Sequence, residues 1–225
     1  MSDTLFSTLE NRLIHCQKCP RLTAWREEIG LVKRKAYRNE IYWAKPVPGF
    51  GDPKAKILVI GLAPGAHGSN RTGRMFTGDD SGKFLYPALW RAGFANQPNG
   101  FDIEDGLSLS QVWITAVCRC VPPDNKPARE EISNCREYLL EEIHLLQNIQ
   151  GVVALGKIAY EEAVRIFQIS AEEVPVFSHG CLIKRTDAHP WILASYHPSR
   201  QNTQTGRLTA GMFDDIWKKA DKLLF

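Results

Sequence analysis

Short apolar runs alternate with amphipathic stretches along this chain, and this alternation constrains the fold more than any other feature. Three runs rich in Ile, Val and Leu are almost continuous in hydrophobicity, as in strands covered on both faces: residues 56–62, 112–118 and 151–155. Three stretches carry apolar side chains at helical spacing: residues 128–146, 157–167 and 208–223. Strands that alternate with helices predict a parallel sheet with helices on both faces. We therefore expect an α/β fold, a three-layer α/β/α sandwich around a central, mainly parallel four-stranded sheet.

Weaker signals predict the remaining elements. Residues 5–14 have helical spacing, and residues 181–185 and 191–195 are short strand candidates. Prolines and glycines predict an extended loop over residues 33–55 and a long loop over residues 63–81. In a parallel sheet, the loops that carry function leave the carboxyl ends of the strands.

The size and composition of the chain suit one globular domain over residues 1–225, with a helical segment at residues 1–50. Of the 225 residues, 44% are hydrophobic and 24% are charged. The apolar runs are far shorter than the roughly 20 residues of a membrane-spanning helix. The first residues include Asp3 and Glu10 and lack the pattern of a secretory signal. We expect a monomer in the cytoplasm, without membrane attachment.

Positive charge is concentrated near the N-terminus. The formal net charge is only +3, but residues 12–38 contain eight Lys and Arg against Glu27 and Glu28, which is 8 − 2 = +6. Such a segment can follow a phosphate backbone, and it can equally be a solvated helix face. The charge distribution therefore leaves nucleic acid open as a partner without establishing it.

Two pairs of cysteines have the spacing of a metal or cluster site. The chain has six cysteines: Cys16, Cys19, Cys118, Cys120, Cys135 and Cys181. In a reducing compartment such thiols are not expected to form disulfides. Cys16 and Cys19 form Cys-x2-Cys, which lets two thiolates chelate one centre, and Cys120 and Cys135 flank a Pro-Pro loop among polar residues. Cys118 and Cys181 adjoin apolar runs and suit core packing. Spacing alone leaves zinc and iron–sulfur open.

The loop after the first predicted strand begins Gly61-Leu62-Ala63-Pro64-Gly65 and continues to Asp79. It lacks the Gly-Lys-Ser/Thr ending of a P-loop and the Gly-x-Gly-x-x-Gly fingerprint, so nucleotide hydrolysis is not expected. It instead combines two cations, an aromatic ring and two polar groups: Arg71, Arg74, Phe76, Asn70 and Asp79. Such groups can hold a flat heterocycle beside a phosphodiester. A structural turn with Phe76 buried in the core is the alternative.

A second loop follows residues 191–195 and contains His197-Pro198-Ser199. The backbone before a proline is extended, so the ring of His197 can be directed away from the strand end. Arg200 and Arg207 follow and can meet phosphates. A single histidine is more often a structural group than a catalyst, so His197 gains weight only together with the first loop.

Taken together, these motifs resemble the uracil-DNA glycosylase superfamily, and most of all its family 5, a bacterial and archaeal branch of broad specificity. The resemblance rests on Gly61-Leu62-Ala63-Pro64-Gly65, on residues 71–79, and on His197-Pro198-Ser199. It extends from about residue 12 to residue 217. It implies a DNA-repair enzyme that hydrolyses the N-glycosidic bond of a deaminated base and leaves an abasic site.

The resemblance also implies roles for individual residues. His197 would hydrogen-bond the departing base, helped by backbone N–H groups near Ala63 and Gly65, and Phe76 would stack on the flipped-out base. The residues expected to complete the base pocket or to hold the DNA backbone are Gly61, Leu62, Pro64, Arg71, Arg74 and Ser199. A four-iron, four-sulfur cluster would be bound by Cys16, Cys19, Cys120 and Cys135, and it would tie residues 1–50 to the domain.

Two departures from better-known branches concern mechanism and specificity. Ala63 stands where common glycosylases have an acidic or amide residue that activates water, so Asp79, Asn70 or Asn125 would orient water instead. Ala116 stands where stricter relatives have an asparagine that reads uracil, and its absence removes a polar filter. We therefore predict activity on uracil together with hypoxanthine and xanthine.

Two other classes of protein fit the same residues. One is a non-catalytic iron–sulfur protein of the same fold that binds DNA damage, which the alanine at position 63 favours. The other is a nucleotide-binding module held together by zinc. Release of a base by the purified protein would distinguish an enzyme from the non-catalytic protein. The identity of the bound metal would distinguish an iron–sulfur protein from the zinc-containing module.

Overall fold

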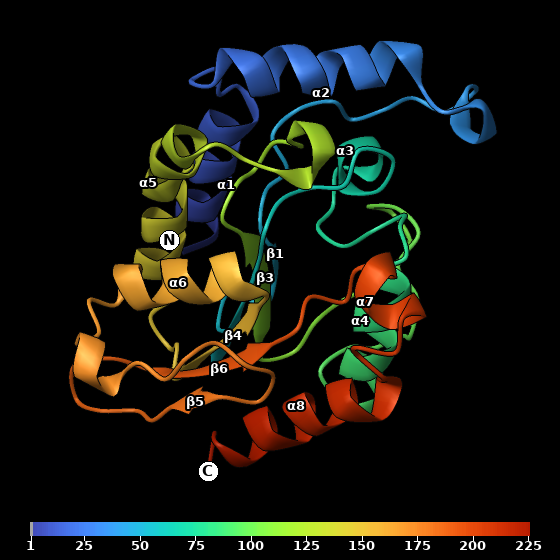
Figure 1. The fold of residues 1–225 in the computed structure, drawn as a ribbon. Helices are drawn as coiled ribbons and strands as arrows, with labels where there is room; N and C mark the ends of the chain where they lie inside the picture. Colours follow the sequence, from blue (N-terminus) through green and yellow to red (C-terminus); the bar gives the residue numbers. More distant parts are fainter. Residues whose placement is uncertain (1) are drawn as a thin grey trace.

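The computed structural model describes residues 2–225 and has an α/β fold built on one six-stranded sheet, in the order β1-β3-β2-β4-β6-β5 (Figure 1). The four inner strands are parallel: β3 (Val112–Ala116), β2 (Ile57–Gly61), β4 (Gly151–Leu155) and β6 (Trp191–Ser195). The two edge strands, β1 (Phe50–Gly51) and β5 (Leu182–Ile183), pair antiparallel with their neighbours. The sheet is therefore mixed.

The expected four-stranded sheet is wrong in its number of strands. Its parallel centre is as predicted, but β1 and β5 extend it at both edges. β5 lies within residues 181–185, which the sequence marked as a short strand candidate. β1 has only two residues, which is too short for an alternation of apolar and polar side chains to be visible in the sequence. β1 also lies within residues 33–55, which were expected to be an extended loop, and it forms only because β3 offers an unpaired edge.

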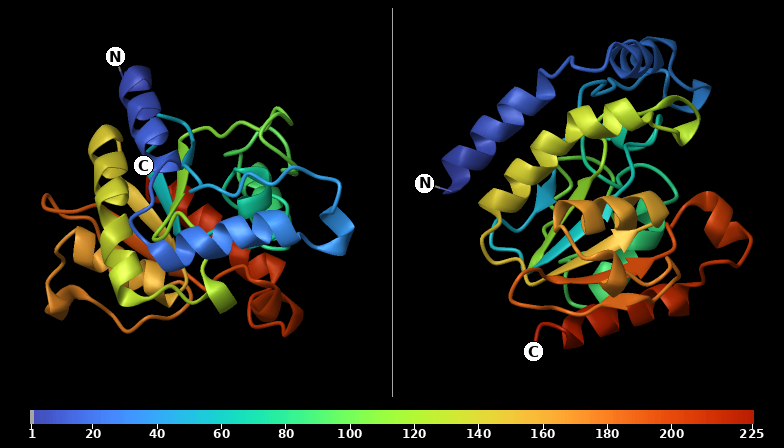
Figure 2. Two further views of the ribbon diagram at one scale, coloured as in Figure 1. Left: turned by 90° about the horizontal axis from the view of Figure 1, so that it is seen from above. Right: turned by 60° about the vertical axis from the view of Figure 1, so that its left-hand side comes forward.

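Helices cover both faces of the sheet (Figures 1 and 2). Helices α4 (Gly82–Arg91) and α8 (Ala210–Lys222) pack on one face, and α5 (Arg129–Leu145) and α6 (Lys157–Ile166) pack on the other. Alternate residues of β2 enter the two cores, Ile57 and Val59 on the α4 side and Leu58 and Ile60 on the α6 side. Helix α1 (Ser2–Ile14) packs outside α5 through Leu9 and Leu13.

Several helices lie in segments where the sequence predicted none. Helix α2 (Pro20–Val32) begins with a proline in its first turn, where the missing N–H is not needed. Helices α3 (Ser69–Thr72) and α7 (Arg200–Gln204) lie within the two loops of interest. Three 3₁₀ turns complete the chain: η1 (Lys35–Tyr37), η2 (Pro123–Asn125) and η3 (Ala171–Glu173).

The strand order places the functional loops together. From β2 the chain moves to β3 on one side of the sheet and then to β4 on the other side. The loops therefore diverge at the carboxyl end of β2, which is the position where ligands bind in open α/β sheets. Among the residues that the structure describes, no helix combines the length and hydrophobicity that crossing a membrane requires.

Candidate active site

A cavity of about 530 Å³ opens at the carboxyl edge of the sheet. Its walls come from the ends of β2 and β3, from η2, from the loop before α4, and from the loop after β6. The lining residues that the sequence singled out are Gly61, Leu62, Ala63, Gly65, Phe76, Asp79, Ala116, Asn125, His197 and Ser199. Pro64, which lies between Ala63 and Gly65 in the chain, is buried and does not line the cavity. This volume lies within the usual range of small-molecule sites, about 300–1,000 Å³.

Phe76 is fixed against the end of β2. Its backbone has φ of 53°, which is rare for a bulky residue, and its side chain is buried. A Cβ atom on Gly61 would lie 2.8 Å from Cζ of Phe76, so only glycine allows the ring to lie against the strand. The aromatic ring thus forms a rigid wall of the cavity.

His197 faces Phe76 from the other loop. The two ring centroids are 5.9 Å apart and the rings are inclined by 28°, so they are stacked. Asn202 of α7 donates a hydrogen bond of 2.9 Å from Nδ2 to the carbonyl oxygen of His197, which holds the loop. The surrounding protein removes water from the imidazole and lowers the pKa of His197 to about 4. The ring is therefore neutral at pH 7 and has one N–H to donate.

Asp79 brings a carboxylate into the same cavity. Its Oδ1 accepts hydrogen bonds from the backbone N–H groups of Ser81 and Gly82, at 3.0 and 3.2 Å. Its Oδ2 lies against the loop after β2. The contact is so close that a Cβ atom added to Gly65 would be only 2.7 Å from Oδ2. Burial raises the pKa of Asp79, and the two N–H donors oppose that shift. Oδ2 can accept a hydrogen bond from water.

Asn125 stands at the rim of the cavity on η2. It is exposed, and both it and the preceding Asp124 have positive φ, 56° and 53°. Two successive residues in the left-handed region are uncommon, although Asn and Asp tolerate it best. The turn directs this part of the β3 loop toward the cavity, which Asn125 and Asp124 both line.

Asn70 does not line the cavity. It is fully buried, and its Nδ2 donates a hydrogen bond of 3.3 Å to the carbonyl oxygen of Arg26 on α2. Within the described residues its Oδ1 has no hydrogen-bond partner. Asn70 therefore links the loop after β2 to the N-terminal region, and this position does not suit a residue that orients water in the cavity.

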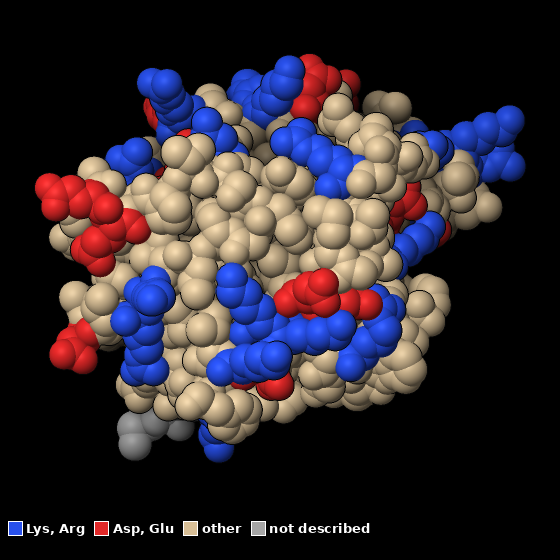
Figure 3. Space-filling view, turned by 60° about the horizontal axis from the view of Figure 1, so that its bottom comes forward, with Lys and Arg blue, Asp and Glu red and all other residues tan. Residues whose placement is uncertain are grey.

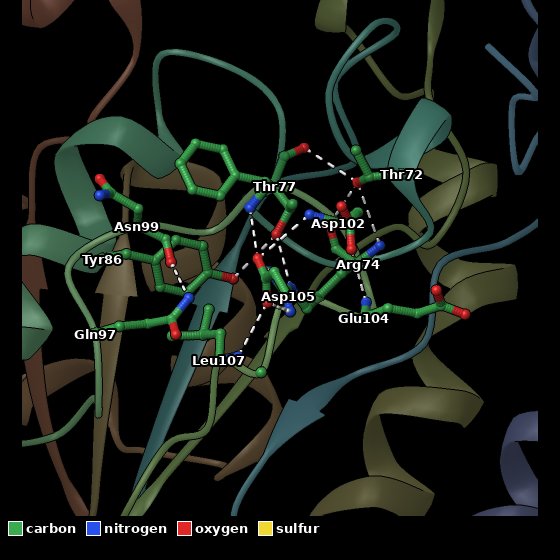
Figure 4. A network of polar contacts seen from close by, with 12 residues as sticks. Thr72, Arg74, Thr77, Tyr86, Gln97, Asn99, Asp102, Glu104, Asp105 and Leu107 are labelled. Atoms are coloured by element: carbon green, nitrogen blue, oxygen red, sulfur yellow. Dashed lines mark hydrogen bonds and ion pairs between the residues drawn. The ribbon is translucent and has the colours of Figure 1, made fainter.

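Arg71 and Arg74 are also absent from the cavity wall, contrary to the expectation that they hold the DNA backbone. Arg74 is buried and forms a bidentate pair with Asp105, with N–O distances of 2.8 and 2.6 Å (Figure 4). Arg71 pairs with Glu40 and donates to the carbonyl oxygens of His67 and Gly78. Both guanidinium groups therefore brace the loop from inside, because buried cations need partners within the protein.

The structure adds residues that the sequence analysis missed. The further lining residues are Ser69, Met75, Asp80, Ser81, Asp124 and Gln201. Arg200, which was expected to meet phosphates, lines the cavity as well. Gln201 directly follows Arg200, Asp80 and Ser81 directly follow Asp79, and Asp124 directly precedes Asn125, so their position next to a predicted residue was the signal that could have found them. Ser69 precedes Asn70, and Met75 lies between Arg74 and Phe76, so the same signal was available for both. Ser69 reaches the wall from the first position of α3.

A second, small pocket lies between the N-terminal helices and α5 and contains four cysteines: Cys16, Cys19, Cys120 and Cys135. Nitrogen donors already approach three of their sulfur atoms. Nη1 of Arg26 lies 3.1 Å from Sγ of Cys120, the backbone N of Arg119 lies 3.2 Å from Sγ of Cys135, and Nδ2 of Asn134 lies 3.7 Å from Sγ of Cys19. Cys118 is buried in the core, as predicted, and Cys181 packs against that core.

The four cysteines share the pocket without being gathered around one point. Among the described residues, no three His, Cys, Asp or Glu side chains are grouped closely enough to hold a metal ion. A zinc ion needs its thiolates about 2.3 Å from one point. Arg26 and Arg119 also line the pocket, and three of their nitrogen atoms are buried without hydrogen-bond partners in residues 2–225: Nε of Arg26, and Nε and Nη1 of Arg119. A larger anionic group with several acceptors matches these donors.

Comparison with known proteins gives one consistent result. The model of the family described as the uracil DNA glycosylase superfamily matches residues 48–221. The Type-5 uracil-DNA glycosylase of Thermus thermophilus is 51% identical over 211 residues, which cover 94% of each chain. The protein of the same name from Mycobacterium leprae is 48% identical over 92% of this chain and 91% of its own. The Type-5 uracil-DNA glycosylase of Pyrobaculum aerophilum is 40% identical over 93% of this chain and 89% of its own.

A stability measurement distinguishes a bracing role of Arg74 from a DNA-binding role. Arg74→Gln should lower the free energy of unfolding by about 3 kcal/mol, because it leaves Asp105 buried without its cation. Arg91→Gln is the matched control, since Arg91 forms a bidentate pair with Asp214 at the surface and should change stability by no more than about 1 kcal/mol. Equal losses in chemical denaturation would contradict the internal role of Arg74.

The protonation of His197 can be measured directly. Its ring resonances, identified in NMR spectra with the His197→Gln variant, should titrate with a midpoint of about 4. Because this pKa lies below the unfolded value of about 6.5, the stabilisation from the neutral ring is complete above about pH 6.5 and is lost as the pH falls toward 4. A midpoint near 6.5 would show that the ring is well solvated.

Proposed function

Because the chain belongs to the uracil-DNA glycosylase superfamily, we propose that the cavity at the carboxyl edge of the sheet receives a flipped-out base and is where its N-glycosidic bond is hydrolysed. The protein is a DNA-repair glycosylase, a hydrolase that acts on uracil in DNA. The observation that carries the assignment of the site is the stacked pair of Phe76 and His197, which joins two loops 121 positions apart (197 − 76 = 121) in one cavity wall.

Binding of the base depends on apolar and aromatic surface. A base must leave the duplex before its glycosidic bond is accessible, and the loss of stacking costs a few kcal/mol. The buried ring of Phe76 offers a replacement surface that needs no reorganisation, because Gly61 and the backbone hold it in place. Leu62, Ala63 and Ala116 add a largely apolar lining.

Departure of the base requires stabilisation of negative charge on it. A neutral imidazole can donate its N–H to a carbonyl oxygen of the base, and this hydrogen bond strengthens as the base becomes an anion. Within residues 2–225, nothing accepts a hydrogen bond from the backbone N–H groups of Ala63 and Gly65, which therefore remain free to act with His197. These donors are fixed before the base arrives, so little reorganisation accompanies the reaction.

Asp79 is our candidate for orienting the attacking water. Its Oδ1 is engaged by two backbone donors, which leaves Oδ2 for a water molecule. Ala63 has no polar side-chain atom, so it does not compete for this task. Asn125 is a second polar group at the rim, and its exposed amide suits contact with the nucleotide or the water.

The residues that line the cavity favour a substrate range wider than uracil alone. Ala116 contributes only a methyl group where an amide would read one base and reject others. A cavity of about 530 Å³ also leaves room for purines. We therefore infer that hypoxanthine and xanthine are substrates together with uracil.

We propose further that Cys16, Cys19, Cys120 and Cys135 bind a four-iron, four-sulfur cluster. The four thiols share one pocket, and the unpaired N–H groups of two buried arginines suit the sulfur atoms and the negative charge of such a group. When bound, the cluster would supply metal–thiolate bonds that join the α1–α2 turn to the β3 loop and to α5. Its role would be to hold the N-terminal helices, and no step of base release depends on it.

A base-release assay tests the proposed chemistry. Duplexes that contain uracil, hypoxanthine or xanthine should all lose the base and break only after alkali treatment. His197→Ala should slow release by about 10²- to 10³-fold, the usual effect of losing one donor to a developing anion. Asp79→Asn should slow it by about 10²-fold or more. His15→Ala, an exposed histidine at the end of α1, is the matched control and should retain wild-type rates.

Two results would count against this proposal. Tight binding of damaged duplexes without release of any base would favour a protein that only recognises damage. Release confined to uracil would contradict the inferred base range while leaving the site itself intact.

Metal analysis tests the cluster. The purified protein should contain four iron atoms and four sulfides per chain, and Cys120→Ala should retain less than about one tenth of the iron. This variant should also lose solubility and thermal stability, because the closure between the N-terminal helices and the β3 loop is lost. Cys181→Ala, outside the pocket, should keep its iron. Zinc in place of iron, or a stable Cys120→Ala variant without metal, would contradict the proposal.

A further inference from the structure

The fold divides the positive charge near the N-terminus into two halves. The first half is used inside the protein: Arg12, Lys18 and Arg21 pair with Glu141, Glu137 and Glu131 of α5, and Arg26 is buried against Cys120. These cations hold α1 and α2 against α5. Carboxylates of α5 therefore balance the charges of Arg12, Lys18 and Arg21.

The second half has no such partners. Within the described residues, no carboxylate pairs with Lys33, Arg34, Lys35 or Arg38. Nζ of Lys33 donates to the carbonyl oxygen of Glu40, and the carboxylate of Glu40 is taken by Arg71. We call residues 31–41 the basic arm. In the left view of Figure 2 it projects at the edge of the molecule, beyond α2.

The basic arm is fixed beside the cavity and is not a free tail. The guanidinium of Arg71 lies 4.1 Å from the ring centroid of Tyr37, and it also donates to the carbonyl oxygen of Gly78. Gly78 precedes Asp79 in the cavity wall. At the other end of the arm, the hydroxyl of Tyr42 lies 3.0 Å from Nδ1 of His67. Arg71 therefore joins the arm to the loop that forms the cavity.

An exposed apolar side chain is held rigidly at the end of the arm. Ile41 is 93% exposed, although Glu40 before it is tied to Arg71 and Tyr42 after it is buried. Leu31 and Val32 at the start of the arm are also exposed, at 82% and 73%. A fixed apolar residue among unpaired cations is typical of proteins that press against a DNA groove while cations contact the phosphates.

We propose that the basic arm is a second DNA contact, in which Arg34, Lys35 and Arg38 bind phosphates of the duplex that flanks the flipped-out base and Ile41 packs against the groove. This proposal rests on the proposed function, since it needs a DNA substrate in the adjacent cavity. The arm would hold the duplex while the base is out of the stack, and Arg71 would set its distance from the cavity.

The opposite part of the surface lacks these features. Figure 3 shows Lys and Arg mixed with Asp and Glu on the face that carries α8. There Arg91 pairs with Asp214 and Lys218 pairs with Asp215, so these two positive charges are balanced locally. The basic arm is different because it combines unpaired cations with exposed apolar side chains and is joined through Arg71 to the loop that forms the cavity.

Salt dependence of DNA binding tests the arm. The holoprotein is titrated, at several salt concentrations, with a duplex that carries a stable abasic analogue, so that no reaction occurs. Replacing Arg34, Lys35 and Arg38 together by Ala should weaken binding and reduce the slope of log K against log salt by up to about 2.7, roughly 0.9 for each phosphate that the protein no longer neutralises. A reduction of this slope by less than about 0.9 would overturn the proposal. That result is also the one expected if the arm binds a protein partner and not DNA.

A matched control triple variant is available on the far side of the molecule. Lys184, Arg185 and Lys222 are exposed, and no carboxylate within residues 2–225 pairs with them. Their replacement by Ala removes the same charge and should leave the slope within about 0.5 of wild type. An equal reduction in both variants would show that only total charge matters, which would overturn the assignment to the arm.

A single substitution tests the apolar contact separately. Ile41→Ser should weaken binding of the same duplex by about tenfold without changing the salt slope, because no charge is removed. Unchanged affinity would remove Ile41 from the interface. Melting temperature and iron content of each variant, compared with wild type, exclude a folding defect.

These outcomes are separate from a failure of the proposed function. If wild-type protein neither binds the duplex nor releases uracil, the proposed function fails. If wild-type protein does both while the arm variant keeps the wild-type slope, only the arm is excluded.

Discussion

Parallel pairing of β2 with β3 on one side and with β4 on the other is the constraint on which the rest of this structure depends. It aligns Gly61 with Ala116 at the carboxyl edge, and it directs the following loops into one space. The two apolar cores on either face hold β2 in place, because its alternate residues enter both. Phe76 can lie against the end of β2 only because Gly61 has no side chain. The position of the aromatic wall is thus a consequence of the sheet.

Arginines act as internal braces in much of this molecule. Arg74 engages Asp105, Arg71 joins the basic arm to the cavity loop, and Arg119 pairs with Glu142 beneath β3. Arg26 connects two regions, since its guanidinium meets Cys120 while its carbonyl oxygen accepts from Asn70. Planar guanidinium groups with several donors suit this task, because one side chain can satisfy acceptors on separate segments. The cavity loop is therefore supported from behind by residues that do not line it.

Sequence reasoning predicted some parts of the site and not others. The motifs around Phe76 and His197 were recognisable from residue types, and the fold brings both rings into one wall. Arg71, Arg74 and Asn70 do not line the cavity, because their side chains contact Glu40, Asp105 and the carbonyl oxygen of Arg26 instead. Residue type shows what a side chain is able to bind, whereas its direction depends on neighbours that are distant in the chain. The two-residue edge strand β1 was missed for the same reason, since its pairing is decided by β3.

The amino-acid sequence by itself determined the α/β class, the parallel centre of the sheet, and the two loops in which the chemistry was expected, because these follow from local periodicity and motif residues. It also determined the total charge near the N-terminus. The tertiary structure decided which of those charges are paired within the protein and which remain in the basic arm, and which polar residues face the cavity. These outcomes depend on distances between segments that are far apart in the chain, and hydrophobic burial fixes such distances only once the helices have packed on the sheet.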